Sequence, residues 1–93
     1  MQEKYQGNPD FIIREIAGEM LLVPVGNAAK TFQWLAALNE TGVFLWKLLQ
    51  EKLTKEEICD RFAREYELTE EESRKDVEEF LEPAIREQII LKC

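Results

Sequence analysis

Residues 38–49 read LNETGVFLWKLL, and this stretch predicts the start of a helix that lies in the protein core. Asn39 is a favoured N-cap residue, and Glu40 places a negative charge in the first turn, where the helix dipole stabilises it. The residues that follow are apolar in almost every direction around the helix axis, which is typical of a buried helix. We therefore expect residues 40–50 to form the central helix, with Trp46 in the core.

Two further helices are predicted downstream, each by a capping box. Thr54 and Thr69 are both followed three residues later by Glu, so side chain and backbone can bond reciprocally. Apolar stripes at helical spacing follow both signals. Pro83 lies inside the last stripe and lacks the amide that would donate to the Glu79 carbonyl. We therefore expect the last helix to kink or end near Glu82.

The first part of the chain predicts strands. Residues 11–16 and 19–25 are rich in branched apolar residues and are separated by an Ala-Gly turn, which indicates a hairpin. Residues 30–38 alternate in a way that favours a third strand, although the AAL at its end would suit a helix equally well. Residues 88–91 are expected to be a short extended segment, and the polar residues 1–10 a loose N-terminal arm.

These elements predict one α+β domain over residues 11–93. A three-stranded antiparallel sheet would pack on a three-helix bundle in the order β-β-β-α-α-α, as in winged-helix proteins. The whole chain has 93 residues, and chains divide into further domains only at several times this length.

Composition and charge argue against several classes of function. The chain has 12 basic and 19 acidic residues, a net charge of −7 and no histidine. No metal site, cofactor motif or catalytic constellation is recognisable, and we interpret the paired glutamates as first-turn and solvated helix residues. Residues 70–87 carry three basic residues (Arg74, Lys75 and Arg86) against eight acidic ones, which would repel nucleic-acid phosphates. We therefore expect a non-enzymatic binding module that does not bind nucleic acid.

The expected location is the cytoplasm. No apolar run approaches the roughly 20 residues that span a membrane, and the first residues lack the order of a signal peptide. Cys59 falls inside a helical pattern and is expected to pack as a small hydrophobe, without a disulfide to Cys93.

The motifs resemble those of PqqD-like proteins, the peptide recognition elements of ribosomal peptide-modification pathways. Residues 38–49 carry the most specific part of this resemblance, which extends over about residues 11–91. Upstream it includes residues 14–23, and downstream residues 54–58, Tyr66 and residues 76–81. The chain departs from the family pattern at Pro83, at Gln88, where a Gly is common, and in the loop of residues 26–30, which lacks a frequent Gly–aromatic pattern.

The resemblance implies that a precursor's leader peptide adds as an antiparallel strand to the third strand, in a groove closed by the last helix. The strand residues that it implies are Thr31, Phe32, Gln33, Trp34, Leu35, Ala36 and Ala37. The helix residues are Arg74, Lys75, Val77, Glu78, Leu81 and Ile85. Arg74 and Lys75 would pair with acidic leader residues, while Val77, Leu81 and Ile85 would either seat leader hydrophobes or pack in the core.

The resemblance also implies that the domain does no chemistry and needs no cofactor. It would hold the precursor beside a separate modifying enzyme, such as a radical SAM enzyme, a cyclase or a protease. An exposed edge strand could also pair two copies into a homodimer. Three alternatives stay open: an interaction module that binds a folded protein, an acidic winged-helix regulator and, with least support, a small enzyme.

Overall fold

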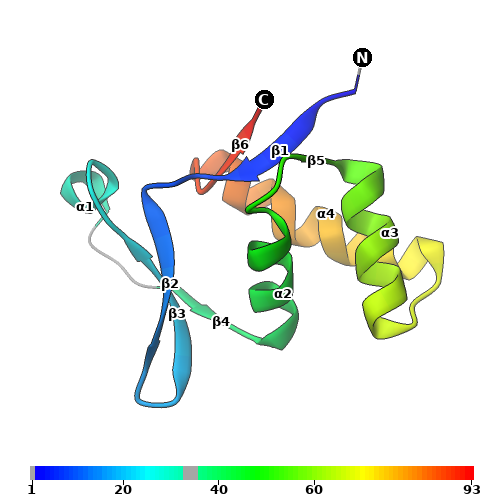
Figure 1. Ribbon diagram of the computed structural model, residues 1–93, viewed down its shortest axis with the longest axis horizontal. Helices are drawn as coiled ribbons and strands as arrows, with labels where there is room; N and C mark the ends of the chain where they lie inside the picture. The colour runs from blue at the N-terminus through cyan, green and yellow to red at the C-terminus, as the bar shows by residue number, and fades with distance from the viewer. Residues whose placement is uncertain (1, 33–35) are drawn as a thin grey trace.

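The computed structural model describes residues 2–32 and 36–93, and it has the α+β architecture that the sequence predicts (Figure 1). Two small antiparallel sheets lie at one side and the top of a group of helices in this view. No helix within the described ranges is long and apolar enough to cross a membrane. The elements are β1 (Lys4–Gly7), β2 (Phe11–Ile16), β3 (Glu19–Pro24), α1 (Ala28–Thr31), β4 (Ala36–Leu38), α2 (Glu40–Leu48), β5 (Leu53–Thr54), α3 (Lys55–Tyr66), α4 (Glu70–Arg86) and β6 (Ile90–Lys92).

The predicted three-stranded antiparallel sheet is confirmed, with strand order β2-β3-β4. Ile16 pairs with Glu19, so only two residues connect β2 and β3. Ala17 and Gly18 have φ angles of 53° and 82°, the left-handed geometry that matches the twist of a hairpin. Strand β4 then pairs with β3 over Met20–Leu22.

Helix α2 lies between the β2-β3-β4 sheet and the other long helices, as its sequence predicts (Figure 1). The Asn39 side chain caps it by accepting from the Gly42 amide at 2.9 Å. Trp46 is 4% exposed, and Leu49 is fully buried. Ile58 and Phe62 of α3 and Val77 and Leu81 of α4 complete this core.

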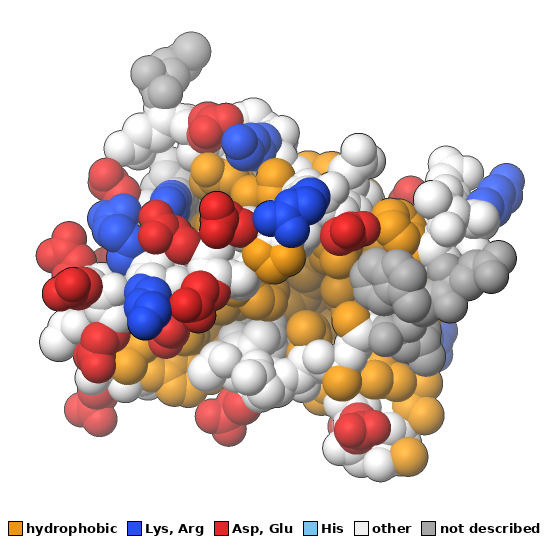
Figure 2. Space-filling model, turned by 180° about the vertical axis from the view of Figure 1, so that it is seen from behind, with side chains coloured by type: hydrophobic (Ala, Val, Ile, Leu, Met, Phe, Trp, Pro, Cys, Tyr) orange, Lys and Arg blue, Asp and Glu red, His pale blue; other side chains and the backbone are white. Residues whose placement is uncertain are grey.

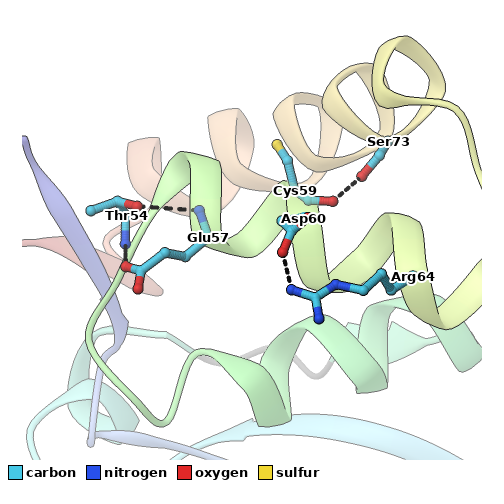
Figure 3. Close-up of polar contacts among 6 residues, drawn as sticks. All are labelled: Thr54, Glu57, Cys59, Asp60, Arg64 and Ser73. Atoms are coloured by element: carbon cyan, nitrogen blue, oxygen red, sulfur yellow. Dashed lines mark hydrogen bonds and ion pairs between the residues drawn. The ribbon is translucent and has the colours of Figure 1, made fainter.

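Both predicted capping boxes are present, and a buried hydrogen bond joins the two helices that they start. Figure 3 shows the first of these boxes and this hydrogen bond. The Thr54 amide donates to Glu57 at 2.8 Å, and the Glu57 amide donates to the Thr54 hydroxyl at 3.2 Å. Ser73 Oγ donates to the Cys59 carbonyl at 2.6 Å, and Ser73 is completely buried. Cys59 itself packs in the core, as expected.

The N-terminal residues differ from the loose arm that the sequence suggests. Lys4–Gly7 form β1, the central strand of a second sheet with the order β5-β1-β6. Gly7 lies so close to α2 that a Cβ atom there would come within 2.9 Å of the Trp46 ring. Gly7 is therefore needed for close packing against Trp46, and this distant contact explains why the prediction of a loose arm was wrong.

Residues 28–31 form the short helix α1, so the prediction of a strand from residue 30 is also wrong. The amides of Ala28, Ala29 and Lys30 each donate to the carbonyl three residues earlier, continuing the turn that begins at Val25. Of the predicted strand, only Ala36–Leu38 form a strand among the described residues, and this strand is β4. Residues 33–35 lie outside the described residues.

Helix α4 does not end near Glu82 but continues through Pro83 to Arg86. Pro83 and Glu79 are exposed, so water can solvate the carbonyl that loses its partner. The helix ends in a Schellman motif, in which the Ile89 amide donates to the Ala84 carbonyl at 2.8 Å. Gln88 takes the left-handed position of this motif, with a φ angle of 61°.

The left-handed conformation of Gln88 predicts that Gln88→Gly stabilises the fold. A non-glycine residue there costs about 1–2 kcal/mol, and the entropy of an unfolded glycine offsets about 0.5–1 kcal/mol of the gain. We expect urea denaturation to show a free energy of unfolding higher by about 0.5–1 kcal/mol. The control is Glu87→Gly, because Glu87 has a φ of −88° and should only lose stability on substitution. Equal destabilisation by both changes would contradict the prediction.

The capping boxes predict a loss of stability in acid. Hydrogen bonds from Thr54 and Thr69 lower the pKa values of Glu57 and Glu72 below their ordinary range. A carboxylate with a lowered folded-state pKa contributes stability above its unfolded-state pKa, and this is lost as the pH falls through the folded-state pKa. We expect the urea concentration at the unfolding midpoint to decrease as the pH is lowered below about 4.5. This decrease should be smaller in the Glu57→Gln/Glu72→Gln double variant. The control variant Glu56→Gln/Glu71→Gln changes two glutamates outside the boxes, and its urea midpoint should decrease with pH as steeply as that of the wild type.

Candidate functional site

Strand β4 forms one edge of its sheet. Within residues 2–32 and 36–93 it pairs only with β3, so its other side presents backbone groups that have no strand beside them. Ala36 and Leu38 are half-buried and Ala37 is exposed, which places alternate side chains on opposite faces. An edge with this geometry can accept an additional strand.

A hollow that is mainly apolar on its strand side lies between this edge and α4. Figure 2 shows hydrophobic side chains gathered in the middle of one face, between a half covered with charged side chains and the sheet. The hollow consists of two depressions of about 460 and 330 Å³, which share Asn39, Gly42 and Phe80. The larger is completed by Glu19, Ala37 and Leu38, and the smaller by Thr41, Leu45, Phe62, Asp76 and Glu79.

Phe80 holds the central position in this hollow because of its place on α4. Val77 and Leu81, its neighbours on the helix, are buried against the core, whereas Phe80 is half-buried at the core's margin. Its side chain therefore contributes to the wall that faces Leu38, across the hollow.

Gly42 is the residue that brings the strand edge and α2 close together. A Cβ atom at Gly42 would lie 3.1 Å from Asn39 Oδ1, which is closer than most Cβ contacts, and 3.4 Å from Leu38 Cδ2, at the limit of ordinary van der Waals contact. The Asn and Gly of the LNETG motif thus act together, since one supplies the cap and the other leaves room for it.

The hollow is acidic at one end. Three carboxylate residues line it, namely Glu19, Asp76 and Glu79, and neither depression has a Lys or Arg among its lining residues. Within the described chain, no group of three His, Cys, Asp or Glu residues could hold a metal ion.

Residues 19–90 match the family model described as coenzyme PQQ synthesis protein D (PqqD). The chain belongs to the PqqD family. No curated protein sequence matches it. A solved structure of TbiB1 in complex with the TbiA(beta) leader peptide has a similar fold, with a TM-score of 0.70, 21% sequence identity and coverage of 91% of this chain and 93% of that one.

Part of the groove implied by the resemblance to the PqqD family is assembled in the structure. Ala36 and Ala37 lie on the β4 edge, as expected. Thr31 belongs to α1 and lines a separate depression of about 360 Å³ with Phe32 and Arg86, at the far end of α4. Phe32 packs on Phe11, with their ring centroids 5.5 Å apart. Gln33, Trp34 and Leu35 lie outside the described residues.

The helix residues of the implied groove are divided between different surfaces of α4. Glu78 forms an ion pair with Lys55 of α3, and the Lys55 ammonium lowers the pKa of Glu78. Arg74 lines two depressions on this α3 side, beside Glu56. Lys75 is exposed, and Ile85 is half-buried at the core's margin.

Val77 and Leu81 lie in the core, which is the alternative that the sequence left open for them. They are 0% and 3% exposed. The side chains that line the hollow in their place are Phe80, Asp76 and Glu79, with Leu38 on the strand. The sequence carries no local signal for this role of Phe80, because Val77, Phe80 and Leu81 fall on one apolar stripe of the helix.

This division of α4 predicts different costs of substitution along one helix. Leu81→Ala removes fully packed core volume and should lower the free energy of unfolding by about 2–5 kcal/mol. Arg74→Ala, on the exposed α3 side, should change it by less than about 0.5 kcal/mol. Chemical denaturation of both variants measures the difference, and a Leu81→Ala protein as stable as wild type would place that side chain outside the core.

Proposed function

We propose that this PqqD-family domain binds the leader segment of a ribosomally made precursor peptide by adding it as a strand to β4. The observation that carries the proposal is the β4 edge beside the apolar hollow of Phe80 and Leu38. Family membership supports it, as does the fold shared with TbiB1, which was solved with a leader peptide.

Strand addition suits the two kinds of contact that the site offers. The backbone groups of β4 would bind the peptide's backbone, which gives affinity that tolerates changes of peptide sequence. The hollow would accept apolar side chains from the face of the added strand that points toward α4. Phe80 and Leu38 would make these contacts, while Val77 and Leu81 would hold the helix in position from the core.

The domain would act without chemistry of its own. By holding the leader, it would raise the effective concentration of the rest of the precursor at a separate modifying enzyme. A radical SAM enzyme, a cyclase or a protease could each use a precursor delivered in this way. The same edge could pair two copies of the domain when no peptide is bound.

Calorimetric titration with the leader segments of short peptides encoded beside this protein's gene tests the proposal. We expect saturable binding at micromolar concentration or tighter, lost when the peptide is scrambled. Phe80→Ala should weaken binding about tenfold, which is the effect of losing about 1.4 kcal/mol at a central contact. The control is Arg74→Ala, on the α3 side of the same helix, and it should bind within about twofold of wild type.

Amide hydrogen exchange locates the peptide independently. Strand addition should slow exchange in β4, at residues 36–38, when the peptide is bound. Binding with protection confined to α3 would overturn strand addition while leaving peptide binding intact. Absence of binding by every leader would overturn the proposed function and favour a folded protein as the partner.

A further inference from the structure

The three carboxylate residues that line the hollow have no basic side chain beside them among the described residues of either depression. Within residues 2–32 and 36–93, the ion pairs join Lys55 to Glu78, Arg61 to Glu51, Arg64 to Asp60 and Lys92 to Glu3. Glu19, Asp76 and Glu79 form none of them. An apolar hollow with carboxylates of one sign at its rim attracts a ligand of opposite charge.

The start of α2 opens into the same hollow, but it does not offer an anion site. Its Gly42 amide is already bonded to Asn39 Oδ1, and Thr41 Oγ1 donates to the same atom at 3.1 Å. Glu40 adds a negative charge in the first turn. The local charges therefore favour a cation over an anion at this end of the hollow.

The alternation of β4 determines how a bound peptide presents its side chains. Ala36 and Leu38 are half-buried on the face toward the core, and Ala37 is exposed on the other. An added strand alternates in the same way, so two peptide residues separated by one would point toward α4. One would enter the hollow beside Leu38 and Phe80, and the other would lie against Ala36 on the adjacent strand.

The direction of the elements determines the order of these contacts. Along α4, Asp76 and Phe80 lie beside Asn39, which follows β4, and Arg86 lies beside Phe32, which precedes β4, so α4 and β4 run in opposite directions. A peptide antiparallel to β4 would run in the same direction as α4. It would therefore pass Asp76 and Glu79 before it reaches the apolar contacts.

We infer that the peptide bound by this groove carries a Lys or Arg on the N-terminal side of two apolar residues that are separated by one residue. The basic side chain pairs with Asp76 and Glu79. One apolar side chain fills the hollow beside Phe80 and Leu38, and the other packs against Ala36 of β4. This inference rests on the proposed function and adds the chemical class of its ligand. It also replaces the acidic leader that Arg74 and Lys75 suggested in the sequence.

Selection of a random-peptide mRNA-display library on the full chain tests the order of residues without knowledge of the natural precursor. Enriched peptides should show the basic residue before the apolar pair. One enriched peptide is then synthesised with its basic residue before the pair and, in a second version of equal composition, after it. The first version should bind about three- to tenfold more tightly, the range for one or two partly exposed ion pairs.

Two variants of equal net charge separate a local contact from the general attraction of a chain with charge −7. Asp76→Asn/Glu79→Gln should abolish the difference between the two versions, whereas Glu65→Gln/Glu82→Gln, on exposed positions outside the hollow, should retain it. The inference would be overturned if the two peptide versions bound with equal affinity, or if both protein variants lost the difference between them equally. Either result would leave peptide binding itself intact. If the library yields no enriched peptides and calorimetry detects no binding of any leader segment, the proposed function itself is overturned.

Discussion

The junction between β4 and α2 is the contact on which the site depends. Asn39 closes the start of α2 with its side chain, and Gly42 leaves the space that this cap needs against Leu38. Because the strand ends where the cap begins, the position of the edge is set relative to the helix core without a connecting loop. Phe80 lines the hollow together with Leu38, Asn39 and Gly42 of this junction, so these four residues determine the width of the hollow.

The helices and the hairpin were predictable because their signals are local. Asn39, Thr54 and Thr69 cap the helices as their sequences indicate, and Ala17-Gly18 forms the two-residue turn. What the sequence missed depends on distant contacts. The second sheet joins residues near both ends of the chain with β5, and nothing near Gly7 in the sequence revealed the Trp46 ring that packs against it.

The candidate site could be predicted only in outline. The strand edge and the helix that faces it were both identified, but the face of α4 that borders the hollow was not. Within one turn of α4, side chains point toward the core, toward α3 and toward the hollow. Sequence spacing alone therefore could not show whether Val77 or Phe80 lines the hollow. Only the packing shows that Arg74 and Glu78 turn toward α3, while Phe80 turns toward β4 and Asp76 toward the start of α2.

Strand β1 has a consequence for where this domain can be cut. The family match begins at residue 19, yet Tyr5 and Phe11 are buried members of the core, and β1 bridges β5 and β6. A fragment trimmed to the matched limits would lack both side chains and the whole of β2, the partner of β3. It would also uncover the Trp46 ring that Gly7 covers. The segment that is recognisable by similarity is therefore smaller than the segment that closes the core, and fragments for expression should keep the residues before it.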